Sequence, residues 1–234
     1  MAGYDKSSGF KAEKFDDRIP RCLTVIRRLA AARMLDVGCG DGFFMQLARE
    51  SGSGFERMAG LELNADAAAK ARRRGFECDV WNVESPFSFG DSCFDLVFAG
   101  EVIEHLADPD VMLDQIHRVL APGGHLLLTT PNLLAWFNRI LVFMGITPVF
   151  VEHSYRATYG PAFSLFHRVG HPVGHLRIFT WTPLKRLLED HGFRIRLRWG
   201  GAYLPVPIVH QLDRGIARIH PRLAATFIVL AQRV

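Results

Sequence analysis

The chain of 234 residues is 49% hydrophobic and 22% charged, which fits one α/β domain with a buried core and excludes global disorder. Residues 1–131 carry 15 basic and 20 acidic side chains, whereas residues 132–234 carry 13 and 4. The basic second half is therefore a candidate surface for an anionic ligand or an acidic membrane, or an ordinary solvated face.

Residues 1–17 are polar and of mixed charge, and they lack the apolar region of a signal peptide. No uncharged apolar stretch reaches the roughly 20 residues that a membrane-spanning helix needs. The four cysteines show no CxxC spacing, so we expect reduced thiols, mostly in the core: Cys22, Cys39, Cys78 and Cys93. These features predict a cytoplasmic location.

Short strands alternate with longer helices along the first 131 residues. Hydrophobic periodicity and capping residues predict helices over 16–32, 43–51, 64–75 and 111–124. The segments between them predict strands over 34–37, 57–63, 76–80, 93–100 and 125–131. Such alternation indicates right-handed βαβ units and a parallel sheet with helices on both faces.

The alternation breaks after the fifth strand, where residues 132–171 are rich in aromatic residues, Gly and Pro. One helical stripe is predicted here, formed by Leu133, Trp136, Phe137, Ile140, Leu141 and Met144. It indicates either a cap helix on the core or a lid over an aromatic, lipid-like or anionic substrate. Residues 132–170 can also rest on a membrane surface as an amphipathic segment. Interleaved arginines and aromatics (Arg139, Arg156, Arg168, with Phe163 and Phe166 among the rings) allow single-stranded RNA as a less favoured partner.

Regular patterns resume at residues 179–192, a predicted helix with Thr180 or Thr182 as cap and Gly192 as its end. Residues 193–199 alternate apolar and basic side chains, as a half-exposed strand does. A helix around 207–220 and a strand over 224–234 complete the chain. We expect a single domain over 1–234, with a ligand-binding core in 1–131, an insertion or lid in 132–175 and a completion of the sheet in 176–234.

The strongest motif is the run LDVGCGDG at residues 35–42, in which a strand enters a glycine-rich turn that opens a helix. Gly38 and Gly40 let the backbone approach a ligand closely, and the following helix N-terminus favours a negative group. The spacing is G-x-G-x-G. It therefore disfavours a nicotinamide-dependent oxidoreductase, whose dinucleotide motif is G-x-G-x-x-G.

Acidic residues lie at the carboxyl ends of the first three strands, which is the edge where this topology binds its ligand. Asp36 can reach an ammonium group, directly or through water. Glu62 ends the second strand, where an acidic side chain can bind a ribose diol. Asp79 ends the third strand and suits an adenine amino group. These positions predict a nucleoside-containing ligand.

A second constellation is Glu101, Glu104 and His105, whose i, i+3, i+4 spacing predicts one shared face of a helical turn. Two carboxylates and an imidazole so close favour a cation between them, and these ligand types suit Mg²⁺, Mn²⁺ or Zn²⁺. His175 is a candidate fourth ligand. A structural network without metal is the alternative, in which His105 can still accept a proton as general base.

Taken in order, the runs LDVGCGDG, GLELN, CDV, FDLVFAGEVIEHL and APGGHLLLTTPN resemble the class I S-adenosylmethionine-dependent methyltransferases. The likeness is close over Met34–Asn132 and looser over residues 174–193. It implies a Rossmann-like, mostly parallel seven-stranded sheet with an antiparallel last strand and a helical insertion after the fifth strand. It also implies a cofactor site in which the methionine part is lined by Gly38, Cys39 and Gly40, the ribose held by Glu62 beside Leu63, the adenine bordered by Asp79 and Val80, and the sulfonium flanked by Gly100 and Glu101.

The E-x-x-E-H pattern with a later histidine is similar to two metal-using groups of that family. One comprises the O-methyltransferases of ubiquinone biosynthesis, and the other modifies the 3′-terminal 2′-hydroxyl of small RNAs. The resemblance implies S-adenosylmethionine and a divalent cation as cofactors, with His105 and Glu101 as catalytic candidates. We expect methylation of a hydroxyl on a small or lipophilic acceptor. An RNA 2′-O-methyltransferase, a nitrogen or carbon acceptor, and a non-catalytic cofactor-binding protein stay open.

Overall fold

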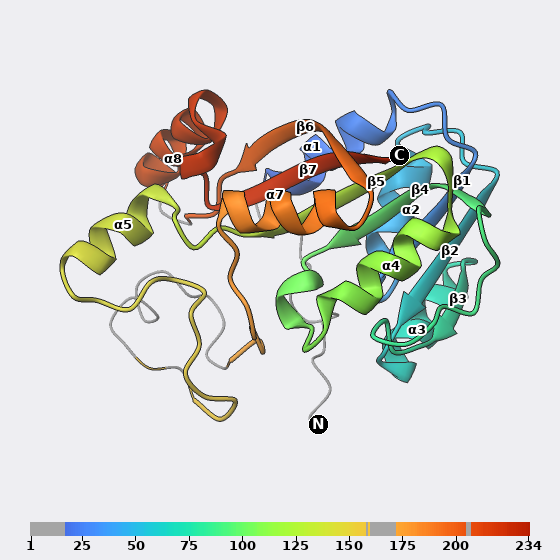
Figure 1. Ribbon diagram of the computed structural model, residues 1–234, viewed down its shortest axis with the longest axis horizontal. Helices are drawn as coiled ribbons and strands as arrows, with labels where there is room; N and C mark the ends of the chain where they lie inside the picture. The colour runs from blue at the N-terminus through green and yellow to red at the C-terminus, as the bar shows by residue number, and fades with distance from the viewer. Residues whose placement is uncertain (1–16, 158, 160–171, 205–206) are drawn as a thin grey trace.

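The computed structural model describes residues 17–157, 159, 172–204 and 207–234. Within them, seven strands form one sheet in the order β3-β2-β1-β4-β5-β7-β6 (Figure 1). β7 pairs antiparallel with β5 and β6, and the other pairs are parallel, which confirms the predicted sheet. The strands are β1 (Arg33–Val37), β2 (Arg57–Glu62), β3 (Glu77–Val80), β4 (Phe94–Gly100), β5 (Leu120–Pro131), β6 (Phe193–Gly201) and β7 (Thr226–Arg233).

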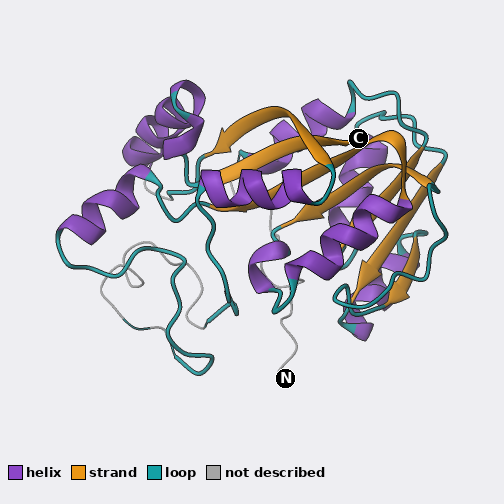
Figure 2. Cartoon of the chain, viewed as in Figure 1, coloured by secondary structure: helices purple, strands orange, loops and turns teal. Residues whose placement is uncertain are grey.

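Helices cover both faces of the sheet (Figure 2). They are α1 (Arg18–Ile26), α2 (Phe43–Glu50), α3 (Ala65–Arg73), α4 (Pro109–Val119), α5 (Trp136–Phe143), α7 (Trp181–Asp190) and α8 (Pro207–Ile219), with short 3₁₀ turns η2 (Ile103–His105) and η3 (Pro221–Leu223). In Figure 1, α4 and α7 lie in front of the sheet, and α5 and α8 lie together at one end of it.

The central strands are buried on both faces, and their side chains alternate between two cores. In β4, Leu96 and Phe98 pack with α1 and α2, whereas Val97 and Ala99 pack with α4 and α7. Because of this alternation, the position of a residue at the end of a strand decides to which face of the sheet its side chain points.

The helix predicted over 111–124 has different bounds. It begins at Pro109, capped by the Asp108 side chain, and ends at Val119, where the chain enters β5. Pro122 explains the early end, because it has no N–H for the helix and disfavours helical geometry in the residue before it. The first helix, predicted to residue 32, also ends early. After it, the N–H groups of Arg28 and Leu29 donate to the carbonyl oxygens three residues earlier, as in a 3₁₀ turn.

The predicted stripe of the insertion is only partly buried. Phe137 and Leu141 pack inward, but Ile140 and Met144 are exposed and Leu133 precedes the helix. Asn138 takes a buried position because its side chain donates to Leu133 O and Val149 O and accepts from Val149 N–H. Residues 158 and 160–171 of the insertion, which include Phe163, Phe166 and Arg168, lie outside the described residues.

The apolar–basic alternation predicted over 193–199 is broken by a shift of register between Ile195 and Leu197 in the pairing of β6 with β7. A bulge of this kind turns the following side chains to the opposite faces. Arg198 consequently lies over the ring of Trp181, 4.2 Å from its centre, while Leu197 is exposed. No helix in the described ranges is both long enough and apolar enough to cross a bilayer.

Asp95 joins β4 to the start of β1 and gives a testable contribution to stability. Its carboxylate accepts the N–H groups of Ala32 and Arg33 and lies 2.6 Å from the Arg33 guanidinium. The side-chain bond from Arg33, helped by the two backbone bonds, holds the pKa of Asp95 below its usual range. This interaction stabilises the fold at pH values above the ordinary carboxyl pKa. The stabilisation is lost as the pH falls through the lower pKa that Asp95 has in the folded state.

We therefore expect Asp95→Asn to lower the free energy of unfolding at pH 7 by about 1–3 kcal/mol. Below about pH 4 the difference from the parent shrinks, because the parent carboxylate then becomes protonated. Urea unfolding at several pH values measures both effects. Asp91→Asn is the matched control, since Asp91 forms an exposed pair with Arg118 and should change stability by less than about 1 kcal/mol. If the free energy of unfolding of Asp95→Asn is still lower than that of the parent by the same amount at pH 2, the charge of Asp95 is not the cause of the stabilisation.

Candidate active site

A glycine-rich loop connects β1 to α2 at the carboxyl edge of the sheet. Gly38 and Gly40 have φ values of 71° and 58°, in the left-handed region that other residues rarely adopt. The N–H groups of Gly38 and Cys39 both donate to Leu61 O, at 2.8 and 3.1 Å. The loop is thereby held against the end of β2.

Glu62 fastens the same loop from the side. One carboxylate oxygen accepts the Gly40 N–H at 2.8 Å, and the other accepts the Asn64 N–H at 2.9 Å. The side chain is buried, and Asn64 caps α3 through bonds from Asp66 and Ala67. A carboxylate has about four lone pairs, so Glu62 keeps acceptor capacity for a ligand hydroxyl. Its role as an anchor of the loop was not apparent in the sequence.

The loop borders a pocket that is open to solvent. Six predicted site residues line it: Asp36, Gly38, Cys39, Gly40, Gly100 and Glu101. The side chain of Asp36 is almost fully buried. The pocket is also lined by residues that the sequence did not indicate, namely Arg18, Phe44, Phe98 and Thr129. The pocket thus combines buried acidic and basic groups with an apolar wall.

The remaining predicted residues lie at the ends of the neighbouring strands. Leu63 follows β2 and Val80 ends β3, and both apolar side chains are exposed. Asp79 accepts a hydrogen bond from the Ser88 hydroxyl at 2.7 Å. These groups form a partly apolar edge with one acidic position beside the pocket.

Arg18 brings a positive charge from α1 into the pocket. Its guanidinium lies 2.5 Å from one oxygen of Glu101, and the other oxygen accepts the Thr129 hydroxyl at 2.8 Å. Arg18 and Glu101 are both mostly buried. Nothing in the spacing of residues 16–20 indicated this contact, which links positions far apart in the chain.

The shared helical face predicted for Glu101, Glu104 and His105 does not form. Glu101 adopts a left-handed backbone with φ of 55°, and only Ile103–His105 make the 3₁₀ turn. Glu101 accepts from Thr129, whereas Glu104 accepts from Thr130 at 3.0 Å. Consecutive strand residues point to opposite faces of a sheet. Glu101 therefore belongs to the pocket, and Glu104 lies on the other side of β5.

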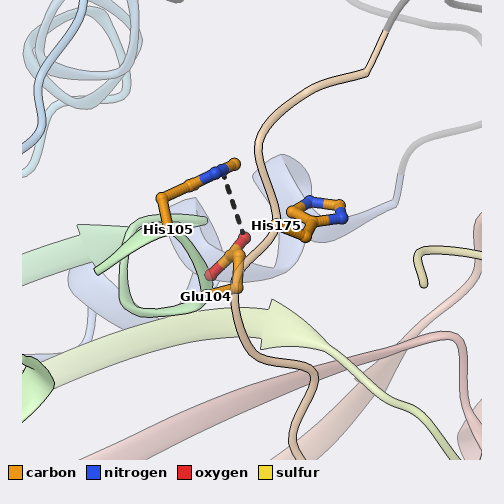
Figure 3. Close-up of side chains that lie close together, drawn as sticks. All are labelled: Glu104, His105 and His175. Carbon is orange, nitrogen blue, oxygen red and sulfur yellow. Dashed lines mark ion pairs between the residues drawn. The ribbon is translucent and has the colours of Figure 1, made fainter. Parts of the chain in front are cut away.

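Three of the four predicted metal-ligating residues do come together. Within the described part of the chain, Glu104, His105 and His175 place one potential ligand atom each within 4.8 Å of one another. Figure 3 shows the Glu104 carboxylate between the two imidazole rings, with His105 Nε2 4.0 Å from Glu104 Oε1. The Glu104 side chain is 0% exposed.

The backbone orients both imidazoles. His105 Nδ1 lies 3.1 Å from Gly174 O, and His175 Nδ1 lies 3.0 Å from Phe150 O. Since a carbonyl oxygen only accepts, Nδ1 carries the proton in each ring, and in a neutral imidazole Nε2 is left with the lone pair. Metal-ligating histidines are commonly oriented in this way. The donor set of one buried carboxylate and two imidazoles fits a divalent cation.

Glu152 positions His175. Its carboxylate accepts the N–H groups of Val173, Gly174 and His175 at 2.7, 2.7 and 3.1 Å. Beyond His175, the next two N–H groups donate to Glu104 O, which ties the segment to η2. Glu152 lies 23 residues before His175 and no local pattern indicated it.

We expect Glu152→Gln to weaken Mn²⁺ binding by about 10- to 100-fold, the usual effect of removing a group that orients a ligand. Gln has one acceptor oxygen for the three N–H groups that the carboxylate binds. Titration of the purified chain with Mn²⁺, followed by electron spin resonance, measures the affinity. Glu189→Gln is the control, because Glu189 is on the surface of α7 in an i,i+4 pair with Lys185. Equal affinities in the two variants would show that Glu152 does not position a ligand.

Residues 9–197 match the family model of a methyltransferase domain. The chain is 34% identical over 110 residues to the ubiquinone biosynthesis O-methyltransferase of Xanthomonas oryzae pv. oryzae (strain PXO99A), which covers 44% of this chain and 45% of that protein. It is 31% identical over 127 residues to the protein of the same name from Caulobacter sp. (strain K31), covering 53% and 48%.

The chain thus spans about half the length of the curated relatives that it matches. Among solved structures, an S-adenosylmethionine-dependent methyltransferase from Mesorhizobium loti superposes with a TM-score of 0.59. The match covers 91% of this chain and 96% of that one at 18% identity. At that identity the likeness shows the fold.

Proposed function

The chain belongs to the family of S-adenosylmethionine-dependent methyltransferase domains, and from this premise we propose that it methylates a hydroxyl oxygen of a small, lipophilic acceptor with the help of a divalent cation. The observation that carries the proposal is the cluster of Glu104, His105 and His175, in which Glu104 is buried and both histidines are partly buried. The names of the relatives point the same way, since those proteins are O-methyltransferases.

The polar groups of the pocket suit the amino-acid end of S-adenosylmethionine, which supplies an electrophilic methyl group on a sulfonium sulfur. Gly38 and Gly40 let the backbone approach the ligand, and Asp36 is the acidic group for its ammonium. Arg18 and the N-terminus of α2 favour its carboxylate. Glu101 holds Arg18 in this position.

The strand ends beside the pocket suit the nucleoside. Glu62 has remaining lone pairs for the ribose hydroxyls. The exposed side chains of Leu63 and Val80 offer apolar surface for the adenine ring, and Asp79 can accept from its amino group. The sum of these groups supports binding of the whole cofactor along the edge of the sheet.

The cluster of Glu104, His105 and His175 would hold the divalent cation. When bound, such a cation lowers the pKa of an acceptor hydroxyl and orients it. The chain contributes the geometry, because the backbone fixes both imidazoles and Thr130 fixes the carboxylate. Without a cation, the Nε2 lone pair of His105 would instead be the candidate to accept the hydroxyl proton.

A lipophilic acceptor is supported by an exposed apolar surface on α5. Phe143 at the end of α5 is 93% exposed, and Ile140, Val142 and Met144 beside it are also exposed. Such a surface on a small helix favours contact with an apolar molecule or with a membrane that contains it. Peripheral contact of this segment with a membrane is part of the proposal.

A labelled methyl-transfer assay tests the proposed acceptor. The chain is incubated with methyl-labelled S-adenosylmethionine and an extract of its source, with and without a chelator, and products are divided into organic-soluble, small aqueous and acid-precipitable fractions. We expect label in the organic fraction, lost with chelator and restored by Mn²⁺. Label in the precipitable fraction would replace the lipophilic acceptor with RNA or protein. Unchanged labelling after chelation would remove the cation from the proposal.

A further inference from the structure

Cys39 and Cys78 bring two thiols into contact at the cofactor loop. Cys39 is the middle residue of the G-C-G turn, and Cys78 lies within β3. Their sulfur atoms are 3.4 Å apart. The two residues are 7% and 4% exposed, so the contact is sheltered from bulk solvent.

The fold builds a compartment around this pair. The sulfurs lie in a small apolar cluster with Met45, Ala68, Ala71 and Phe76. In β2, Gly60 leaves the space that the Cys39 side chain occupies, because a Cβ there would lie 2.5 Å from Cys39 Sγ. Any larger residue at position 60 would force the Cys39 side chain to move.

The two thiols differ in acidity. A hydrogen bond from Cys39, helped by the nearby Arg72 guanidinium, lowers the pKa of the Cys78 thiol against the opposing effect of burial. The same bond and burial raise the pKa of the Cys39 thiol. Arg72 is fixed by its bond to Cys78 O at 2.6 Å. Cys78 is therefore the sulfur that more readily gives a thiolate, which is the reactive form.

The pair also adjoins the pocket that we propose for the cofactor. Cys39 lines the cofactor pocket, and its neighbours Gly38 and Gly40 shape the loop. The N–H groups of residues 38–40 are bound to Leu61 O and to Glu62. A displacement of the Cys39 side chain would therefore be transmitted to the backbone that borders the ligand.

We propose that Cys39 and Cys78 form a reversible disulfide on exposure to a hydroperoxide, and that this disulfide weakens cofactor binding. The proposal rests on the proposed function, since its effect is on the S-adenosylmethionine pocket. An S–S bond of about 2.05 Å requires the sulfurs to approach by roughly 1.3 Å. Bound cofactor covers Cys39, which lies between the pocket and Cys78, and so closes the route by which a peroxide reaches the Cys78 sulfur; the reaction is then slower.

The chemistry balances with one hydroperoxide per disulfide. The Cys78 thiolate attacks a peroxide oxygen and breaks the O–O bond, which gives a sulfenic acid and releases an alcohol, or water from hydrogen peroxide. The Cys39 sulfur, on losing its proton, then attacks the sulfenyl sulfur. The S–S bond forms and water leaves. Two thiols are oxidised, the peroxide is reduced, and a dithiol such as dithiothreitol reverses the change.

The test begins with the reduced chain, whose affinity for S-adenosylhomocysteine is measured by calorimetry. Hydrogen peroxide is then added, with and without S-adenosylhomocysteine, and a protease digest is examined by mass spectrometry for the peptide linked through Cys39 and Cys78. We expect the linked peptide, slower formation in the presence of S-adenosylhomocysteine, and an affinity reduced by roughly tenfold or more. Dithiothreitol should restore the original affinity.

Two variants make the result specific. Cys78→Ala removes the pair. We expect this variant to bind S-adenosylhomocysteine as tightly as the parent with free thiols does, and we expect peroxide to leave that affinity unchanged. Cys93→Ala is the matched control and should respond like the parent, because Cys93 lies apart on a partly exposed site. The absence of the linked peptide, or a linked chain with unchanged affinity, would overturn the proposal. A reduced chain that fails to bind S-adenosylhomocysteine before any peroxide is added would instead contradict the proposed function on which it rests.

Discussion

Glu62→Gln is expected to weaken binding of S-adenosylhomocysteine by about 100-fold or more. The carboxylate accepts N–H groups from Gly40 on one side and Asn64 on the other. Gln can accept only one of them, and its amide N–H₂ then faces the other donor. Loss of a charge-assisted bond costs about 1.5–3 kcal/mol, and 1.4 kcal/mol corresponds to a factor of ten in affinity. The loop and the proposed ribose contact are affected together.

Calorimetric titration with S-adenosylhomocysteine measures this effect. Glu77→Gln is the matched control, because Glu77 lies on the neighbouring strand in an exposed pair with Arg57. It should bind like the parent. Unchanged affinity in the folded Glu62 variant would remove Glu62 from the cofactor site and leave it a purely structural residue.

The second large effect is expected at Glu104. This carboxylate is fully buried, accepts from Thr130 and lies between His105 and His175. Glu104→Gln keeps the shape and the bond from Thr130 but removes the negative charge that a divalent cation needs. We expect loss of measurable Mn²⁺ binding and a decrease of about 100-fold or more in kcat, as for the loss of a Lewis-acid or acid–base contribution.

Affinity for S-adenosylhomocysteine separates this outcome from misfolding. Because Glu104 lies on the opposite face of β5 from the pocket, the variant should bind the ligand within about twofold of the parent. Glu189→Gln on the surface of α7 is the control for charge. A Glu104 variant with full activity and full Mn²⁺ affinity would show that the cluster is a structural network.

Much of the fold was predictable because its signals are local. Glycines and caps punctuate helices and strands over the first 131 residues, and the LDVGCGDG run identifies β1, the loop and α2. Element ends were less predictable where two local preferences compete, as at Val119, where a helical pattern meets Pro122. The buried face of α5 was predicted only in part: Phe137 and Leu141 are buried as predicted, but Asn138 is buried as well, because its side chain satisfies the backbone of a neighbouring segment.

The residues of the candidate site likewise fall into those that local patterns predict and those that depend on contacts between distant segments. Asp36 and the loop glycines were predictable from one motif, and His175 from its residue type and the family resemblance. Arg18 and Glu152 were not, since each acts through a contact between distant segments. The separation of Glu101 from Glu104 depends on a left-handed backbone at Glu101, which is uncommon for a residue other than glycine. Such tertiary determinants leave no periodic trace in a sequence.

The most direct test of the central claim is the binding of S-adenosylhomocysteine to the reduced parent chain, measured by calorimetry beside an equal titration with NAD. The pocket of Gly38, Gly40 and Asp36, with Glu62 at its border, predicts one bound S-adenosylhomocysteine per chain and no heat of binding from NAD. If NAD binds and S-adenosylhomocysteine does not, the proposed cofactor site is wrong and a dinucleotide-dependent enzyme is indicated instead.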